Sequence, residues 1–252
     1  MGYLHEGHLS LVRAAREDCA SVVVSVFVNP AQFGPAEDLW CYPRDFKRDH
    51  SLLTKEGVDV LWAPTPEIMY PAGYQTWITV EQVSERHEGK MRPNHFRGVA
   101  TIVAKLLNAV QPQKAYFGQK DAQQAVVIRR MTRDLNYPVE IIVCPIVRER
   151  NGLAMSSRNV YVNPDERQAA TVLYRSLSAA SEAFQKGERQ AGRLREIVIQ
   201  TISAEPVVRL QYVSCADPDT LEELEGSIEG KALLSLAVYV GTTRLIDNQI
   251  LG

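Results

Sequence analysis

The chain has 252 residues, of which 45% are hydrophobic and 23% are charged. This composition is ordinary for a folded globular protein, and the length allows one large domain or two domains with separate cores. The formal net charge of -2 provides no overall basic field for nucleic acid, and no apolar run reaches the ~20 residues of a membrane helix. We therefore expect no nucleic-acid or membrane partner, although local basic clusters could hold small anions such as phosphate.

The four cysteines (Cys19, Cys41, Cys144 and Cys215) are scattered, and no two of them form a CxxC pair. A disulfide framework or a structural zinc site needs closer grouping, so reduced thiols are favoured. The amino-terminal sequence MGYLHEGH has no basic flank followed by an apolar core, and therefore it does not resemble a secretory signal. These features predict a cytoplasmic protein.

The first half of the chain alternates helical and strand-like patterns. Residues 21–28 (SVVVSVFV) form a β-branched run that is typical of a parallel strand buried on both faces. Strands that alternate with helices predict an α/β fold with a doubly wound parallel sheet and right-handed connections. We expect helices near residues 9–17, 45–56, 99–110 and 122–135, and strands near 21–28, 58–63, 114–117 and 139–144.

The pattern changes near Pro145. Two consecutive amphipathic helices are predicted at residues 164–186 and 191–203, and three strand-like segments follow them, at 207–213, 232–240 and 243–250. Helices followed by strands joined through turns predict a second, smaller α+β domain with an antiparallel sheet. We place the boundary near residue 147, which gives domains 1–147 and 148–252.

The first candidate site is the motif His5-Glu6-Gly7-His8, which leads directly into a helix. Imidazoles at i and i+3 on a first helical turn point the same way, towards free N–H groups that attract anions. The motif therefore suits nucleotide phosphates, and Gly7 lets a ligand approach the backbone closely. Zinc proteases space their histidines at i and i+4, so metal binding is disfavoured. A plain helix start with two surface histidines stays open at this point.

A second candidate is Met155-Ser156-Ser157-Arg158, which follows an Asn-Gly turn. Two hydroxyls and a guanidinium on one loop could clamp a polyphosphate, since arginine supplies a planar fork of donors. The loop alone also fits an ordinary solvated segment. Combined with the HxGH motif, it resembles the paired ATP signatures of the nucleotidyltransferase superfamily that includes class I aminoacyl-tRNA synthetases, where the second loop typically reads KMSKS.

Two further segments follow predicted strands, where ligands of open α/β sheets bind. In residues 117–124, Lys120 could meet a phosphate, while Asp121 could instead cap the next helix. In residues 29–34 (NPAQFG), amides could bind a small polar substrate, or the segment could be a simple turn. A fifth segment, residues 92–98 (RPNHFRG), is by itself a basic loop of the kind that is usually solvated.

These five segments, in this order and spacing, resemble the pantothenate synthetase family. The resemblance extends through residues 42–44 (YPR), 98–101 (GVAT) and 241–248 (GTTRLIDN), so it covers essentially the whole chain. It implies a Rossmann-like domain followed by a smaller domain that closes over the nucleotide. It also implies a homodimer, because such enzymes commonly form one.

The resemblance implies an ATP-dependent ligase that acts in two steps. A carboxylate oxygen of pantoate attacks the α-phosphorus of ATP, which gives pantoyl adenylate and pyrophosphate. The amine of β-alanine then attacks the acyl carbon and releases pantothenate and AMP. Positioning and charge stabilisation dominate such phosphoryl transfer, with Mg²⁺ on the phosphates.

The resemblance also implies roles for individual residues, with His8 as the family's assigned proton donor. We interpret His5 and His8 as donors to phosphate oxygens, because a carboxylate nucleophile has no proton to remove. No protein ligand to a metal is expected. The implied catalytic residues are His5, His8, Lys120, Ser156, Ser157 and Arg158. The implied ATP contacts are Met1, Gly2, Tyr3, Leu4, His5, Glu6, Gly7, His8, Gly118, Gln119, Lys120, Asp121, Val147, Met155, Ser156, Ser157 and Arg158. The implied substrate contacts are Gln32, Gln124, Asn29, Arg92 and His95, with Gln32 also near the β-alanine site.

One departure from the family concerns the first strand of the sheet. Family members carry a strand that ends in Pro-Thr before the HxGH motif, whereas here the chain begins at Met1. Unpaired backbone groups on the neighbouring strands would cost ~1–3 kcal/mol each. We therefore expect Met1 to be an internal methionine of a longer protein. The alternatives are a truncated, inactive nucleotide-binding homologue or another HxGH adenylyltransferase with a different acceptor.

Overall fold

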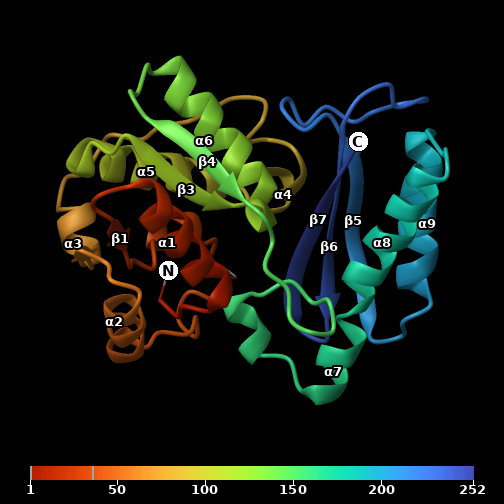
Figure 1. Cartoon of the computed structure of the whole chain (residues 1–252), viewed down its shortest axis with the longest axis horizontal. Helices are drawn as coiled ribbons and strands as arrows, with labels where there is room; N and C mark the ends of the chain where they lie inside the picture. Colours follow the sequence, from red (N-terminus) through yellow and green to blue (C-terminus); the bar gives the residue numbers. More distant parts are fainter. Residues whose placement is uncertain (1, 36) are drawn as a thin grey trace. The chain divides into compact units, whose positions relative to one another are not determined.

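The computed structural model describes residues 2–35 and 37–252, and the chain forms two compact units. Unit 1 contains the chain up to Gln119 and again Gln123–Pro145 (Figure 1). Unit 2 contains Lys120–Ala122 and Ile146–Gly252. The predicted domain limits at residues 147 and 148 stay a prediction.

Unit 1 is built from short parallel strands and helices. Asp45 accepts a hydrogen bond from the backbone N–H of Arg48 at 3.0 Å and so caps the second helix. The helices are α1 (Glu6–Asp18), α2 (Phe46–Lys55), α3 (Pro66–Met69), α4 (His87–Met91), α5 (His95–Val110) and α6 (Ala122–Asp134), with short 3₁₀ turns η1 (Pro30–Gln32) and η2 (Gln119–Asp121). The strands are β1 (Val23–Ser25), β2 (Val60–Trp62), β3 (Lys114–Gly118) and β4 (Glu140–Cys144).

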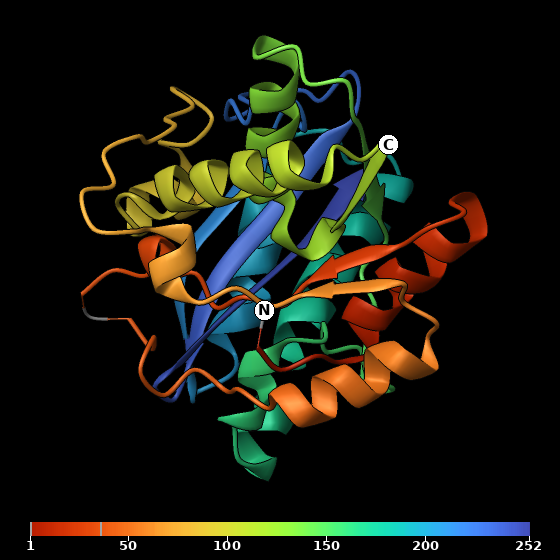
Figure 2. The same ribbon diagram turned by 90° about the vertical axis from the view of Figure 1, so that its left-hand side faces the viewer.

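The strands of unit 1 form two parallel pairs. β1 pairs with β2, so that Val24 lies opposite Leu61, and β3 pairs with β4, so that Tyr116 lies opposite Ile142. The two pairs are separate among the described residues, and helices lie beside them (Figure 2). The predicted α/β class with parallel strands is confirmed.

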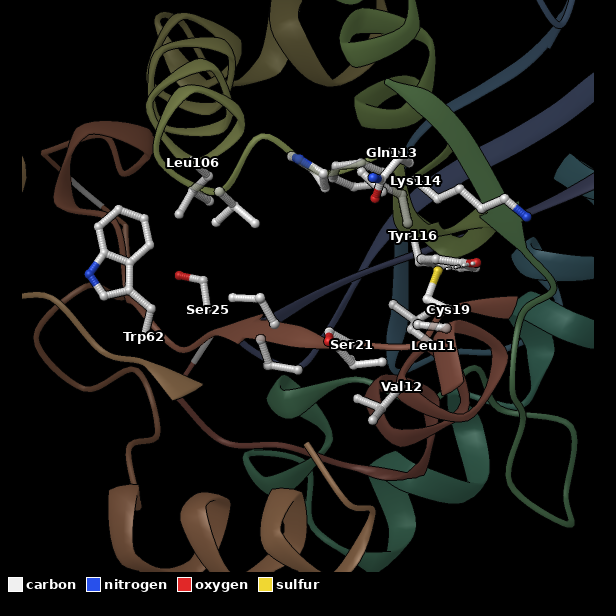
Figure 3. Close-up of a pocket in the computed structure, with 18 of the residues that line it drawn as sticks. Leu11, Val12, Cys19, Ser21, Ser25, Trp62, Leu106, Gln113, Lys114 and Tyr116 are labelled. Atoms are coloured by element: carbon white, nitrogen blue, oxygen red, sulfur yellow. Dashed lines mark hydrogen bonds between the residues drawn. The ribbon is translucent and has the colours of Figure 1, made fainter. Parts of the chain in front are cut away.

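An apolar groove of about 760 Å³ lies between β1 and β3, with side chains of α1 and α5 along it (Figure 3). No strand among the described residues pairs with either of the two edges that border it. The labelled residues that line the groove include Leu11, Val12, Ser21, Leu106, Lys114 and Tyr116.

The predicted strand at residues 21–28 is wrong in its length and burial. Only Val23–Ser25 form β1, and Val23 is 38% exposed. The sequence pattern assumes a neighbour on each side, whereas β1 has a partner on one side only within the described residues. Val22 and Val26, which flank β1, are buried in a small core with residues of α1 and α2.

Unit 2 places two long helices against an antiparallel sheet. Its elements are η3 (Ser157–Val160), α7 (Pro164–Ala169), α8 (Val172–Gln185), α9 (Ala191–Ser203), β5 (Val208–Ala216), β6 (Ala232–Val240) and β7 (Thr243–Leu251). The strand order is β5-β6-β7, and apolar residues of α8, α9 and the sheet form one core. The predicted α+β unit is confirmed, and no described helix is long and apolar enough to cross a membrane.

The single helix predicted at residues 164–186 is instead two helices. α7 has a capping box, in which Asn163 and Glu166 each accept a hydrogen bond from the other's backbone N–H at 2.9–3.0 Å. α7 ends at Ala169, and α8 begins at Val172. Burial continues across this break, because Ala169 at the end of α7, Ala170, and Val172 at the start of α8 all belong to the same core.

Candidate active site

The HEGH motif forms the start of α1, as its sequence predicts. α1 begins at Glu6, and the backbone N–H of His5 donates to Nδ1 of His8 at 3.2 Å. The two ring centroids lie 3.8 Å apart. Because Nδ1 of a neutral His8 is the acceptor, its Nε2 carries the proton and is a donor. Met1, another predicted ATP contact, lies outside the described residues.

The segment that precedes the motif is fixed by α2. The backbone N–H of Leu4 donates to Oδ1 of Asp49 at 2.8 Å, and Arg48 donates to the carbonyl of Leu4 at 2.8 Å. Asp45 donates its backbone N–H to the carbonyl of Gly2 at 2.8 Å. Asp49 is fully buried, and burial raises the pKa of its carboxyl. Sequence reasoning missed Asp49, which shares no local pattern with the motif.

Asn29 is buried at the end of the segment that follows β1, and four groups fix its amide. Its Oδ1 accepts from the backbone N–H of Ala31 at 3.2 Å and from the hydroxyl of Tyr70 at 2.8 Å. Its Nδ2 donates to the carbonyl of Gly98 at 3.1 Å and to Oε1 of Gln32 at 3.4 Å. The structure therefore brings the predicted residues Asn29 and Gln32 together, and it adds Tyr70.

His95 and Arg92 lie against the same turn. Arg92 Nη1 lies 3.2 Å from His95 Nε2, and His95 Nδ1 lies 2.8 Å from the carbonyl oxygen of Gln32. A guanidinium only donates, so Nε2 accepts, and Nδ1 carries the proton and donates to Gln32. Burial, with a contribution from Arg92, lowers the pKa of His95 to about 4, which keeps the ring neutral at pH 7. Glu37 in turn accepts two hydrogen bonds from Arg92.

Two adjacent glutamines at the start of α6 differ in their contacts. Gln123 is buried, donates to the carbonyls of Val83 and Arg86 at 2.8 Å, and accepts from the N–H of Glu88 at 2.9 Å. These bonds use the Gln123 amide within the protein. Gln124 is half-buried and has no such bond to another described residue. Of the two, Gln124 is the one whose amide suits a ligand.

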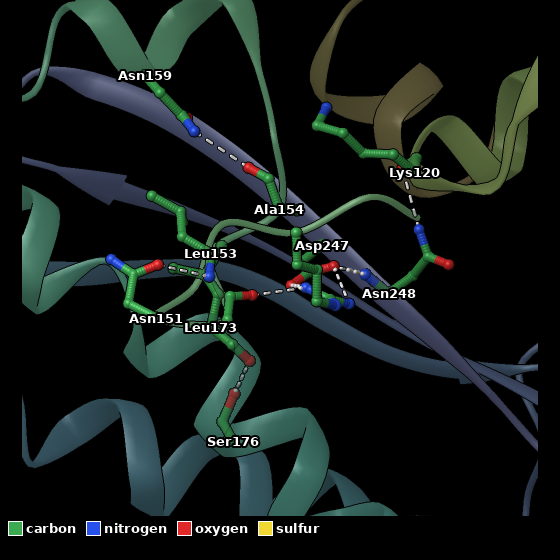
Figure 4. A network of polar contacts seen from close by, with 11 residues as sticks. Lys120, Asn151, Leu153, Ala154, Asn159, Leu173, Ser176, Asp247 and Asn248 are labelled. Atoms are coloured by element: carbon green, nitrogen blue, oxygen red, sulfur yellow. Dashed lines mark hydrogen bonds and ion pairs between the residues drawn. The ribbon is translucent and has the colours of Figure 1, made fainter. Parts of the chain in front are cut away.

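Lys120 belongs to unit 2, where β7 holds its backbone. Nδ2 of Asn248 donates to the carbonyl of Lys120 at 3.0 Å (Figure 4). The Lys120 ammonium lies 3.7 Å from a carboxylate oxygen of Asp121. The neighbouring Asp247 accepts two hydrogen bonds from Arg148, at 2.6 and 3.0 Å, and one from the N–H of Asn248. Burial raises the pKa of Asp247, and Arg148 opposes that rise. Asn248, in the segment 241–248 that carries part of the resemblance, therefore contacts Lys120, a predicted ATP contact.

Residues 147–155 form a small hairpin in unit 2. The backbone N–H of Met155 donates to the carbonyl of Val147 at 3.0 Å, so two predicted ATP contacts are neighbours. Gly152 occupies the turn with φ +91°, a conformation that other residues rarely adopt. Asn151 accepts from the N–H of Leu153 at 3.1 Å and stabilises the same turn.

The Ser156–Arg158 segment follows this hairpin and begins η3. The hydroxyl of Ser156 accepts from the backbone N–H of Arg158 at 3.3 Å, and Ser157 is buried. Asn159 donates to the carbonyl of Ala154 at 3.1 Å and holds the two ends of the loop together (Figure 4). The predicted residues are thus neighbours within unit 2 on a braced loop.

The candidate side chains of each unit include donors that suit anions. Those of unit 1 are imidazoles, amides and a guanidinium, and those of unit 2 are hydroxyls, an ammonium and a guanidinium. Among residues 2–35 and 37–252, no group of three or more His, Cys, Asp or Glu side chains could hold a metal ion. A parallel α/β unit with an HxGH helix start is an architecture that suits a nucleotide-using enzyme.

Comparison with known proteins identifies the family. The model of the Pantoate-beta-alanine ligase family matches residues 1–250. The pantothenate synthetase of Roseiflexus castenholzii is 61% identical over 251 residues, which cover 100% of this chain and 90% of that protein. The protein from Heliobacterium modesticaldum with the same name is 57% identical over 250 residues, with 99% and 89% coverage. The chain therefore belongs to the pantoate–β-alanine ligase family.

Solved structures agree with this assignment. The crystal structure of pantothenate synthetase from Thermus thermophilus has a TM-score of 0.95 and 49% identity, and the match covers 99% of this chain and 90% of that one. A pantoate–β-alanine ligase from Francisella tularensis, complexed with β,γ-ATP and β-alanine, has a TM-score of 0.80 and 33% identity, with 99% and 87% coverage. The predicted family and fold are confirmed.

Proposed function

We propose that this chain joins pantoate to β-alanine at the expense of ATP, through pantoyl adenylate, and releases AMP and pyrophosphate. The observation that carries the proposal is the match of the Pantoate-beta-alanine ligase family to residues 1–250. The ATP and β-alanine in the Francisella tularensis complex support the same substrates here. Neither an inactive homologue nor an adenylyltransferase with another acceptor receives comparable support.

His8 and His5 are proposed to stabilise the first step. A pantoate carboxylate oxygen forms a bond to the α-phosphorus, the bond from that phosphorus to the bridging oxygen breaks, and pyrophosphate leaves. His8 has its proton on Nε2 because the His5 N–H occupies Nδ1. That proton can be donated to a phosphate oxygen that gains charge in the transition state. The N-terminus of α1 adds a favourable field for the same anion.

The donors of unit 2 are proposed to hold the polyphosphate. Lys120 supplies a point charge, and Arg158 supplies a planar fork beside the hydroxyls of Ser156 and Ser157. The remaining proposed ATP contacts supply backbone groups or shape. They are Gly2, Tyr3, Leu4, Glu6, Gly7, Gly118, Gln119, Asp121, Val147 and Met155, together with Met1.

Gln32 and Gln124 are proposed to bind pantoate, with Gln32 also near β-alanine. An amide can donate to a carboxylate and accept from a hydroxyl, which matches both groups of pantoate. Asn29, Arg92 and His95 are proposed to line the same pocket. Their contacts to the Gln32 turn support a positioning role there.

Mg²⁺ is proposed to enter bound to the ATP phosphates. This ion usually keeps several waters and binds through phosphates rather than through a dedicated protein cage. When bound, it would neutralise the charge that develops on the leaving pyrophosphate. A homodimer and a cytoplasmic location are proposed from the family resemblance and, for the location, from the scattered cysteines.

A coupled assay tests the function. Purified chain, ATP, Mg²⁺, pantoate and β-alanine should yield pantothenate, AMP and pyrophosphate in equal amounts. Without β-alanine, one equivalent of pyrophosphate should form while the adenylate stays bound. Binding of ATP without release of pyrophosphate would instead favour an inactive homologue. Product only with an acceptor other than β-alanine would favour a different adenylyltransferase.

The His8→Ala substitution tests the assigned role of His8. We expect the single-turnover rate of adenylate formation to fall by about 100-fold, as is typical when one donor to developing charge is removed. The substitution His50→Ala is the matched control, because His50 is an exposed imidazole on α2. An adenylation rate that is unchanged in His8→Ala would refute the role.

A further inference from the structure

Tyr70 contacts the proposed substrate loop from a distant part of the chain. It caps the C-terminus of α3, and its hydroxyl donates to Oδ1 of Asn29 at 2.8 Å. Its ring stacks on Trp77 and meets Tyr74 edge to face, with centroids 5.6 and 5.1 Å apart. Burial raises the pKa of Tyr70 to about 12, so its hydroxyl keeps its proton at neutral pH. Packing holds the ring, and the hydroxyl is a permanent donor.

The orientation of the Asn29 amide is fixed by groups that have only one hydrogen-bonding role. The backbone N–H of Ala31 can only donate, and it lies 3.2 Å from Oδ1. The carbonyl of Gly98 can only accept, and it lies 3.1 Å from Nδ2. A flipped amide would oppose both groups, so oxygen and nitrogen are assigned by chemistry. Tyr70 adds the second bond to the oxygen, in a place that is buried from water.

The Asn29 amide then sets the orientation of Gln32. Asn29 Nδ2 lies 3.4 Å from Oε1 of Gln32, and a flipped Gln32 would bring two NH₂ groups together. The Gln32 backbone is held separately, because His95 donates to its carbonyl at 2.8 Å. Gln32 Nε2 makes no hydrogen bond to any described residue, so its two N–H groups are available to a substrate.

We propose that Tyr70 is a positioning residue for pantoate. Its hydroxyl holds the Asn29 amide, and that amide turns the NH₂ group of Gln32 towards the substrate. The class of group recognised is an acceptor, which fits the carboxylate or a hydroxyl of pantoate. This inference rests on the proposed function, because it assigns Gln32 to pantoate.

The Tyr70→Phe substitution tests the proposal. It keeps the ring and removes only the hydroxyl, so the Asn29 oxygen loses one of its two donors. We expect KM for pantoate to rise by about 10-fold, which is the effect of ~1.4 kcal/mol, while KM for ATP and the unfolding midpoint stay near the wild-type values. The matched control is Tyr74→Phe, since Tyr74 belongs to the same ring cluster and does not contact Asn29.

A double-mutant cycle separates positioning from a general structural effect. In a Gln32→Ala background, Tyr70→Phe should not change KM for pantoate further, because the group that Tyr70 positions is absent. Three results would overturn the proposal: an unchanged KM in Tyr70→Phe, an equal rise in Tyr74→Phe, or loss of folding in Tyr70→Phe. If the wild-type chain forms no pantothenate, the proposed function itself fails. If the wild-type chain is active and Tyr70→Phe leaves KM for pantoate unchanged, only the role of Tyr70 is rejected.

Discussion

The sheets of the two units differ in the length of their strands and in how deeply those strands are buried. β6 has nine residues, lies between β5 and β7, and is buried along almost its whole length. β1 and β2 have three residues each, and Val23 and Val60 are 38% and 52% exposed. Successive residues of β6 point to opposite faces of the sheet and nearly all are buried, so β6 needs a nearly continuous apolar run, whereas strands with exposed residues do not. Apolar burial therefore dominates the sheet of unit 2.

Buried polar groups hold the loops of unit 1 that carry the proposed substrate contacts. Asn29, Asp49, His95 and Gln123 are all buried, and each bonds to backbone groups of a segment far away in sequence. Such bonds contribute little net stability, but leaving a partner unsatisfied is costly. The loops that carry the proposed substrate contacts are thus held in place by specific hydrogen bonds rather than by bulk apolar packing.

The largest expected change in the free energy of unfolding comes from a substitution in the core of unit 2. Leu234→Ala removes a fully buried side chain of β6, and it should lower the free energy of unfolding by about 4 kcal/mol. Val23→Ala in β1 is the contrasting substitution and should cost less than about 1 kcal/mol, because Val23 is partly exposed. Denaturant titration measures both values. Equal losses would show that β1 is as tightly packed as β6, and the comparison would fail.

The pattern of apolar residues in the sequence predicts the limits of those helices and strands that are held by burial of apolar side chains. The strand at Ala232–Val240 has its predicted limits, and α2 lies within the helix predicted at residues 45–56. The pattern fails at residues 21–28, because it cannot reveal whether a neighbouring strand is present. It also misses the break between α7 and α8, where one core covers both helices.

The candidate site is predictable only in part, because a sequence pattern reveals neighbours along the chain and not contacts between distant segments. His5 and His8 are neighbours in sequence, so their proximity on one helical turn follows from spacing alone. Tyr70 lies 41 residues from Asn29, and Asp49 lies 45 residues from Leu4. No local pattern encodes such contacts. Their partners become visible only when the fold brings the two segments together.

The second largest expected effect is a dependence of the free energy of unfolding on pH, caused by His95 in unit 1. The pKa of His95 falls from 6.5 to about 4 on folding, so the folded state binds fewer protons than the unfolded state between these values. Stability should therefore decrease as pH falls from 6.5 to 4, by ~1.4 kcal/mol per unit and about 3 kcal/mol in total. His95→Asn should remove this part of the slope. The measurement is the free energy of unfolding of both chains between pH 7.5 and 4.5.

An exposed histidine provides the control for that experiment. His50→Asn is the matched control for the loss of one imidazole, because His50 lies on the surface of α2. A slope in His95→Asn that equals that of the wild type would mean that other groups dominate acid sensitivity. In that case the neutral imidazole assigned to His95, and its donation to the Gln32 carbonyl, would need revision.

The smallest effects come from two helical glycines, one in each unit. A Cβ at Gly98 in α5 would lie 2.2 Å from the carbonyl oxygen of Ala31, so Gly98→Ala must displace the turn that holds Gln32. We expect a loss of about 2 kcal/mol and a higher KM for pantoate. Gly192 in α9 has no atom within 4 Å of such a Cβ, so Gly192→Ala should gain ~0.5–1 kcal/mol through helix propensity alone.

Gly98→Ala and Gly192→Ala are expected to change the free energy of unfolding in opposite directions, and this difference tests the comparison of the two units. The same methyl group is added to a helix in both cases, so propensity favours both substitutions equally. Only the close approach of Gly98 to the backbone of the Asn29–Gln32 turn distinguishes them. If Gly98→Ala also stabilised the chain and kept its KM for pantoate, the turn could shift without harm. The hydrogen bonds that the Gly98 carbonyl accepts and that His95 and Tyr70 donate would then not define the position of Gln32.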